Sequence, residues 1–173
     1  MQRLVRLYRE RRLVRFGVEG ALLVVAVAAI GAWQTRNHPR GAPPPVALRT
    51  LEGAPASLAA WRGRTTLVEV WAPWCGVCKV QTDNLARAHR WLGGRANVIS
   101  VAASFESEAE VRAAMRAHDI TVPVLLADAR FTQQMRVSAY PTVFVLDADG
   151  RVVSSLQGYT TTLGLVLRAL WAR

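Results

Sequence analysis

The segment Thr65–Cys78, TTLVEVWAPWCGVC, carries the strongest structural signal in this chain. Its first half, Thr65–Trp71, is rich in β-branched and apolar residues, which predicts a buried β-strand. The following residues, Gly76–Leu92, have apolar side chains at helical spacing and end at a glycine pair, which predicts an α-helix. The two cysteines of the chain, Cys75 and Cys78, therefore stand where a strand passes into a helix.

This position affects the acidity and the pairing of the two cysteines. Unpaired backbone N–H groups and the helix dipole favour a thiolate at a helix N-terminus, so we expect a lowered pKa for the Cys75 thiol. Cys78 lies one helical turn deeper on the same face, within reach of a disulfide bond. We expect Cys75 to be the exposed nucleophile and Cys78 the covered thiol that resolves a mixed disulfide.

Three other uses of the cysteine pair compete with redox chemistry. A zinc site lacks a second cysteine pair, and the three histidines have no ligand-like spacing around Cys75 and Cys78. A Cu(I) site is physically reasonable because thiolates suit that ion. A permanent structural disulfide would close a loop of only four residues and would stabilise the fold little.

Strand and helix signals alternate through the rest of the chain, which favours an α/β fold. Further strands are expected at residues 46–50, 97–103, 124–127, 142–146 and 151–156. Helices are expected at residues 107–118, 131–135 and 161–171, with one helical turn at 57–61. Asp147–Gly150 has the composition of a hairpin turn. Trp61, Trp91 and Trp171 are interpreted as packing residues.

Composition excludes several classes of protein. At 173 residues and 51% hydrophobic content the chain is long and apolar enough for one folded domain, which excludes a disordered protein. Two cysteines are too few for a disulfide scaffold. The net charge of +10 is concentrated in residues 1–40, which hold eight arginines and two glutamates, so the basic balance does not indicate nucleic-acid binding.

The first forty residues predict a membrane anchor. An apolar stretch, Phe16–Trp33, contains a single charge, Glu19, and approaches the length that crosses a bilayer as a helix. Six arginines precede it and only Arg36 and Arg40 follow closely, so the N-terminus is expected to be cytoplasmic and the remainder exported. The alternatives are a cleaved signal peptide, for which residues 29–31 supply small side chains, and a buried core helix.

These signals divide the chain into four expected parts. Residues 1–15 form an arginine-rich cytoplasmic segment and residues 16–35 a transmembrane anchor. Residues 36–45, which include three consecutive prolines, form a semi-stiff tether. Residues 46–173 form the folded domain.

The segment Val70–Cys78 resembles the active-site segment of thioredoxin-like proteins. Together with the arginine-led anchor and short tether, it makes the chain most similar to the membrane-anchored TlpA/ResA/DsbE group. The tail Gly158–Thr161, followed by Gly164-Leu165 and Leu167-Arg168, resembles the ScsD (suppressor of copper sensitivity D) branch. The resemblance covers about residues 46–173 and implies a thioredoxin fold, in which helices flank a mixed central sheet.

The resemblance also suggests roles for residues outside the cysteine pair. Glu69 aligns with a buried acid that handles protons for the second cysteine, and burial would raise the pKa of its carboxyl. The alternative is a glutamate at a strand edge that reaches water. Tyr140-Pro141 aligns with a cis-proline that faces the disulfide and leaves the backbone of Tyr140 free to bind an extended substrate. Trp71 and Trp74 are expected to shield the disulfide, with Trp74 more exposed.

The resulting prediction is a protein disulfide oxidoreductase tethered to the bacterial inner membrane, with its folded domain in the periplasm. Its partners would be exported proteins with thiols or disulfides and a membrane electron donor of the DsbD or ScsB type, and it would need no cofactor or metal. Gly76-Val77 and Gln81 leave open whether it reduces or oxidises. A Cu(I)-handling thiol chaperone is the alternative, and Ala72 argues against a thiol peroxidase, which has threonine there.

Overall fold

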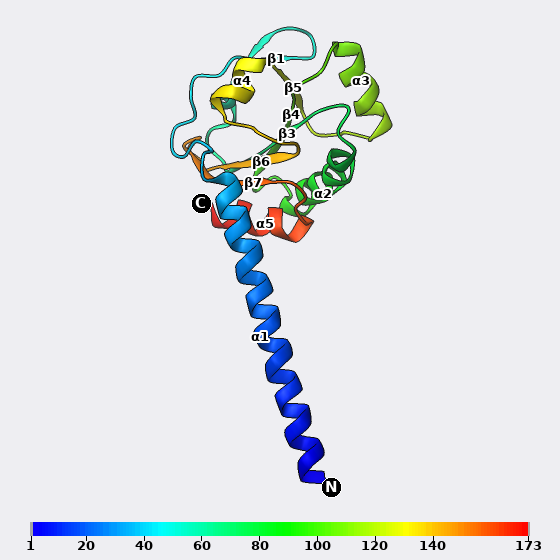
Figure 1. The fold of residues 1–173 in the computed structure, drawn as a ribbon. Helices are drawn as coiled ribbons and strands as arrows, with labels where there is room; N and C mark the ends of the chain where they lie inside the picture. The colour runs from blue at the N-terminus through cyan, green and yellow to red at the C-terminus, as the bar shows by residue number, and fades with distance from the viewer. Residues whose placement is uncertain (1, 173) are drawn as a thin grey trace. The chain divides into compact units, whose positions relative to one another are not determined.

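The computed structural model describes residues 2–172, with side chains from Val14 onward (Figure 1). The chain divides into two compact units, Met1–Arg36 and Asn37–Arg173. The first is a single helix, α1 (Gln2–Thr35). Its segment Val14–Thr35 is long and apolar enough to cross a bilayer, which agrees with the expected anchor in length and composition.

The second unit is built on one seven-stranded mixed sheet. Its strand order is β2-β1-β5-β4-β3-β6-β7, with β3 parallel to β4 and antiparallel to β6. The interior position of β3 follows from its apolar sequence, since a strand covered on both faces carries few polar residues. The strands are β1 (Leu48–Thr50), β2 (Pro55–Ala56), β3 (Thr66–Trp71), β4 (Asn97–Ala102), β5 (Val124–Ala127), β6 (Thr142–Leu146) and β7 (Val152–Gln157).

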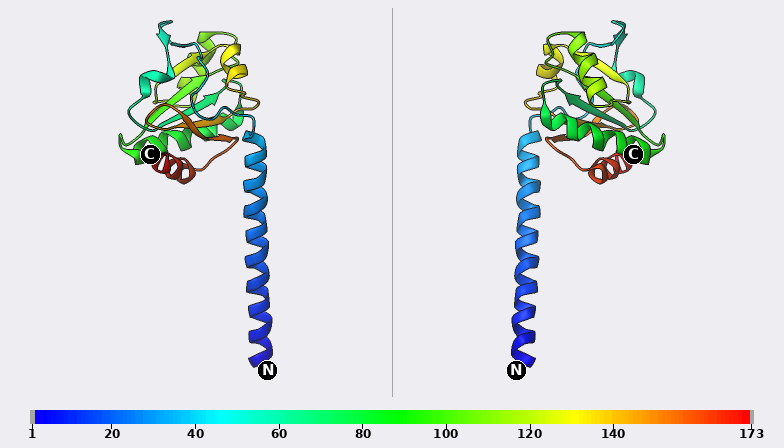
Figure 2. Two further views of the ribbon diagram at one scale, coloured as in Figure 1. Left: turned by 90° about the vertical axis from the view of Figure 1, so that its left-hand side faces the viewer. Right: turned by 90° about the vertical axis from the view of Figure 1, so that its right-hand side faces the viewer.

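Helices cover both faces of the sheet, and Figure 2 shows α2 and α5 together on one side. Buried residues of α2, α3 and α5 join one hydrophobic cluster, whereas those of η1 and α4 join the other. The helices are η1 (Leu58–Trp61, a 3-10 helix), α2 (Gly76–Leu92), α3 (Glu108–Ala117), α4 (Ala129–Gln134) and α5 (Thr162–Trp171).

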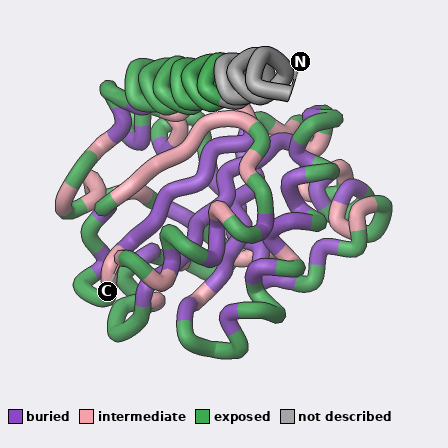
Figure 3. Tube along the Cα trace, turned by 90° about the horizontal axis from the view of Figure 1, so that it is seen from below, coloured by how far each residue is buried: buried purple, intermediate pink, exposed green. Residues whose placement is uncertain are grey.

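Strand β3 separates the two clusters because its side chains alternate between the faces. Leu67 and Trp71 pack on the side of α2, whereas Val68 and Val70 pack on the side of α4. All six residues of β3 are buried, and the tube in Figure 3 shows the buried strands running through the middle of this unit. A strand so enclosed is a rigid base for whatever follows Trp71.

The expected strands and helices are present, but the structure adds one short strand and corrects the interpretation of two tryptophans. The short strand β2 was not expected, because a proline-alanine pair has no strand pattern of its own and only pairing with β1 defines it. The interpretation of Trp91 and Trp171 as packing residues was wrong, since both lie exposed at the ends of their helices. Smaller residues fill the inward faces there, namely Ala88 and Leu92 on α2 and Leu165, Val166 and Ala169 on α5.

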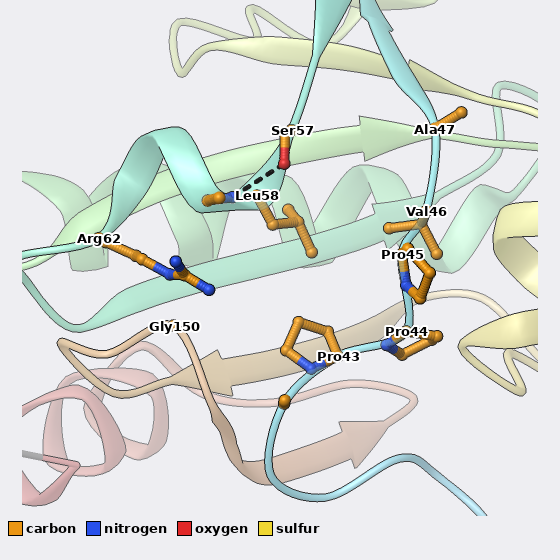
Figure 4. Close-up of a pocket in the computed structure, with 11 residues that line it drawn as sticks. Pro43, Pro44, Pro45, Val46, Ala47, Ser57, Leu58, Arg62 and Gly150 are labelled. Carbon is orange, nitrogen blue, oxygen red and sulfur yellow. Dashed lines mark hydrogen bonds between the residues drawn. The ribbon is translucent and has the colours of Figure 1, made fainter.

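The segment 37–45 packs against the folded domain. Gly41 and Val152 exchange two backbone hydrogen bonds, of 2.9 and 2.7 Å, so the segment pairs with the free edge of β7. The ring of His38 is buried against Phe144, with ring centroids 5.3 Å apart, and burial lowers the pKa of His38. The prolines at 43–45 line an open pocket of about 450 Å³ beside Arg62 (Figure 4). The compact unit thus begins at Asn37, before the expected start at residue 46.

Substituting Gly41 tests this docking. Gly41 has a φ of +77°, so Gly41→Ala is expected to cost about 1–2 kcal/mol of stability through left-handed backbone strain. Amide hydrogen exchange at Val152, whose N–H donates to the Gly41 carbonyl, should become faster. Gly53→Ala, with similar strain at φ +83° in the β1–β2 turn, is the control and should leave the Val152 amide protected. Equal exchange in both variants would contradict the docked arrangement.

Candidate active site

The cysteine pair lies at the first turn of α2, directly beyond the enclosed strand β3. Cys75 is the N-cap residue of α2 in an extended conformation, and its backbone N–H donates to the Ala72 carbonyl at 3.0 Å. Cys75 and Cys78 form a disulfide, with their Cα atoms 5.3 Å apart. The rigid strand and the first helical turn therefore hold both sulfur atoms in a fixed place.

The backbone N–H of Cys78 donates to the sulfur of Cys75 at 3.2 Å. This is the N-cap interaction of a helix, with sulfur in place of the usual oxygen. The same N–H group, together with the helix dipole, would stabilise negative charge on that sulfur in the reduced protein. Of the two sulfurs, the local geometry therefore favours negative charge on that of Cys75.

The two cysteines differ in accessibility, though less than expected. Cys75 keeps 9% of its surface and Cys78 keeps 2%. The expectation that Cys75 is exposed is corrected: in the disulfide form it joins the hydrophobic cluster that holds Trp71, with Tyr140 packed against it. Cys75 remains the more accessible of the two sulfurs.

Trp74 and Tyr140 form an aromatic rim next to the disulfide. Their rings meet edge to face, with centroids 5.7 Å apart. The indole N–H of Trp74 donates to the Ser104 carbonyl at 2.8 Å, and Ser104 has a positive φ of 53°. Trp74 is thus held in one orientation although 64% of it is exposed. Burial raises the pKa of Tyr140, against a smaller opposing effect of a hydrogen bond with Ser104.

The peptide bond between Tyr140 and Pro141 is cis, which confirms the geometry implied by the resemblance. The bond directly precedes β6, which pairs with β3. Tyr140 also lines an open pocket of about 400 Å³, together with Ser104, Phe105 and Asp128.

Glu69 lies in the middle of β3 and is fully buried. Burial raises the pKa of its carboxyl to about 8. The alternative position at a strand edge is excluded, because β3 is flanked by β4 and β6. Glu69 shares the face of Leu67 and Trp71, so it lies under α2 on the side of the cysteines.

Two further polar side chains, those of Ser100 and Gln81, are buried on the α2 side of the domain, and sequence reasoning missed Ser100. Ser100 is the register partner of Glu69 on β4, so both side chains lie on the same face. The Glu69 carboxyl oxygens, the Ser100 hydroxyl and the Gln81 side-chain nitrogen all lack a hydrogen-bond partner among the described residues. Only the pairing of β3 with β4 places Ser100 here, and its own strand pattern gives no such signal.

Gln81 and Asn84 connect α2 to the loop before α5. The side-chain oxygen of Gln81 accepts a hydrogen bond from the Thr160 N–H at 2.8 Å, and the side-chain nitrogen of Asn84 donates to the Thr160 carbonyl at 2.9 Å. Both backbone groups of Thr160 are therefore bound by side chains of the cysteine-bearing helix. This fixes α5 against α2 one turn beyond Cys78.

Comparison with known proteins places this arrangement in a family. The model of the Redoxin family matches residues 39–164. The chain belongs to the Redoxin family. It is 29% identical over 109 residues to the thioredoxin-like protein YneN of Bacillus subtilis, covering 62% of this chain and 64% of that protein. It is 25% identical over 119 residues to the thiol-disulfide oxidoreductase ResA of the same species, covering 68% and 66%. The alignments thus span about two thirds of these relatives.

Solved structures agree on the fold. A thiol:disulfide interchange protein of Chlorobium tepidum superposes with a TM-score of 0.64 at 24% identity, over 77% of this chain and 97% of that one. A DsbF homologue of Corynebacterium diphtheriae gives a TM-score of 0.63 at 22% identity, over 75% and 83%. The expected thioredoxin fold, a mixed sheet flanked by helices, is confirmed.

The buried carboxyl gives stability a pH dependence of known sign. Because the Glu69 pKa is raised to about 8 in the folded protein, the folded state keeps a proton that the unfolded chain releases above about pH 4.5. Unfolding free energy should fall by roughly 1.4 kcal/mol for each pH unit between these values. Glu69→Gln should remove this fall, as measured by denaturant unfolding of the disulfide form at pH 5 and pH 8. A wild-type protein equally stable at both pH values would contradict a neutral buried Glu69.

Proposed function

We propose that this protein is a thiol–disulfide oxidoreductase that exchanges disulfides with other proteins through Cys75 and Cys78. The observation that carries the proposal is the disulfide at the N-terminus of α2, next to Trp74, whose ring meets that of Tyr140 at the cis bond before Pro141. Membership of the Redoxin family and similarity to a protein named thiol-disulfide oxidoreductase support it.

In the reducing direction the Cys75 thiolate attacks one sulfur of a substrate disulfide. A mixed disulfide forms between Cys75 and the substrate, and the other substrate sulfur leaves as a thiolate and takes up a proton. The Cys78 thiolate then attacks the Cys75 sulfur, which releases the second substrate thiol and forms the disulfide seen in the structure. Two electrons pass from the protein to the substrate, and the oxidising direction is the reverse.

Glu69 acts in this cycle as the base for Cys78. Cys78 is almost fully buried, so its proton needs an acceptor inside the protein when it attacks. Glu69 lies on the same side of the sheet as Cys78, fully buried, and an acid whose pKa is about 8 exchanges protons readily with a thiol. Glu69 accepts the proton from Cys78 in one direction and returns it in the other.

Trp74 and the Tyr140-Pro141 bond bind the substrate chain. Trp74 offers a large exposed aromatic surface in a fixed orientation, which is the usual property of an anchor residue in a protein interface. The backbone of Tyr140 pairs with an extended substrate segment, as in strand addition. Both features hold the substrate sulfur near Cys75.

We further propose that residues 16–35 anchor the chain in the bacterial inner membrane, with residues 1–15 in the cytoplasm and the folded domain in the periplasm. The length and composition of α1 and the arginines that precede it support this topology. Reduction then requires a membrane electron donor of the DsbD or ScsB type, and an exported cysteine-containing protein is the partner. The tail Gly158–Thr161 favours the ScsD branch.

A resolving-cysteine variant tests the exchange mechanism. In Cys78→Ser, Cys75 can still attack a substrate disulfide, but no second thiol is present to resolve the mixed disulfide that forms. Mixed disulfides between Cys75 and protein partners should therefore accumulate, and mass spectrometry identifies them. Cys75→Ser is the matched control and should give none. Equal, nonspecific products from both variants would contradict the mechanism.

A reporter fusion tests the topology. A periplasm-active reporter fused after Pro45 should be active, because six arginines hold the N-terminal end in the cytoplasm. The same fusion with these arginines replaced by glutamine is the control and should lose activity. A silent reporter in the unaltered chain would contradict export.

A further inference from the structure

Three large apolar side chains lie exposed at one end of the folded domain. Trp91 is 56% exposed in the last turn of α2, and Leu167 and Trp171 are 48% and 85% exposed on α5. Leu167 and Trp171 are four residues apart, so they form one stripe along the helix surface. Their inward-facing neighbours already fill the core, so these side chains have no packing role within the domain.

Two hydrogen bonds place the ends of α2 and α5 beside the start of β3. The Thr65 hydroxyl donates to the Ala172 carbonyl at 3.3 Å, which ties the end of α5 to the start of β3. The adjacent Arg64 donates to the Gly94 carbonyl at 3.1 Å, just beyond α2. Trp91 and Trp171 therefore lie on the same end of the domain.

Arginines surround these residues. Arg95 donates to the Trp91 carbonyl at 3.0 Å, which holds its guanidinium beside Trp91, and Arg64 lies next to it. Asp147 and Asp149 are the acidic residues of the nearby β6–β7 turn, whose Ala148 carbonyl accepts a hydrogen bond from Gly63. Basic groups nevertheless predominate among the exposed residues at and beside the ends of α2 and α5. We call this surface the Trp–Arg face: Arg64, Arg90, Trp91, Arg95, Leu167, Arg168 and Trp171.

The Trp–Arg face lies at the end of the domain opposite the disulfide. Cys75 begins α2 and Trp91 lies in its last turn, and a 17-residue helix spans about 25 Å. Residues 37–45 pair with the domain at the same far end. Gly41 pairs with Val152 of β7, Val152 with Leu146 of β6, and Leu146 with Thr66 at the start of β3.

We infer that the Trp–Arg face binds the headgroup region of a bilayer that contains anionic lipids. Tryptophan and leucine beside arginine are the side chains that favour the membrane interface, with the rings at the headgroup level and the guanidinium groups on lipid phosphates. The occupant follows from this chain itself, since the compact domain starts at Asn37, directly after a helix able to cross a bilayer. The inference rests on the proposed anchor and makes no use of the dithiol chemistry.

Docking of this face on the bilayer determines which proteins can reach the active site. With the Trp–Arg face on the headgroups, the disulfide end points away from the bilayer. Cys75 and Trp74 are then presented to proteins in the aqueous compartment, and substrates buried in the membrane are excluded.

Photo-crosslinking of the full chain in lipid nanodiscs tests the inference. Trp171 is replaced by p-benzoyl-phenylalanine, and adducts are identified by mass spectrometry. The same replacement at Val80, which is 51% exposed near the disulfide end of α2, is the matched control. Position 171 should give lipid adducts at least about tenfold above position 80. Replacing Arg90 or Arg168 by glutamine should lower them about fivefold each in discs with anionic lipid.

Three outcomes would overturn the inference. Adducts from position 171 to a second copy of the chain would make the Trp–Arg face a dimer interface. Equal lipid adducts at positions 171 and 80, or none at either in an inserted chain, would show that the face does not dock. A chain that fails to co-elute with the nanodiscs would overturn the anchor itself. The Cys78→Ser trap is unaffected by all three, so failure of the exchange mechanism is separately visible.

Discussion

The structure depends on one junction, where the fully buried strand β3 passes into α2 at Cys75. Because β3 is enclosed by β4, β6 and helices on both faces, its end is fixed within the core. The hydrogen bond from the Cys78 N–H to the Cys75 sulfur then sets where the first helical turn begins. The same contact that caps the helix prepares one sulfur for charge, so folding and chemistry share a single geometric feature.

The protonation state of Glu69 determines the charge beneath that junction. Interaction of a charge with a helix terminus contributes about 0.3–1 kcal/mol at an exposed site, whereas raising the Glu69 pKa to about 8 corresponds to several times that. Burial of the carboxyl is thus the larger effect, and Glu69 is mostly protonated at neutral pH. Protonated Glu69 does not repel a thiolate on Cys78, and its ionised fraction, roughly a tenth at pH 7, is the form that can take up the Cys78 proton. Ser100, the register partner of Glu69 on β4, is a buried hydroxyl on the same face of the sheet.

Much of this arrangement could be predicted from the sequence because it is local. The apolar run before Trp71, the helical spacing after Gly76 and the glycine that ends α2 each fix an element within a few residues. Non-local features escaped prediction. Ser100 meets Glu69 only through strand pairing, and Thr160 meets Gln81 across 79 positions of sequence. The exposure of Trp171 depends on which residues of α5 face α2, and a helix with apolar residues all round does not reveal that.

The docked segment 37–45 shows why composition alone misassigned a boundary. A run of prolines reads as an extended spacer because proline cannot join a helix or donate a hydrogen bond. Edge strand β7, however, exposes unpaired backbone groups, and an exposed edge invites pairing with other chains. Gly41 supplies both a donor and an acceptor to Val152 at a φ that other residues adopt only with strain. The segment therefore gains hydrogen bonds by pairing with β7 and protects part of its edge, so a sequence with the composition of a linker belongs to the folded domain.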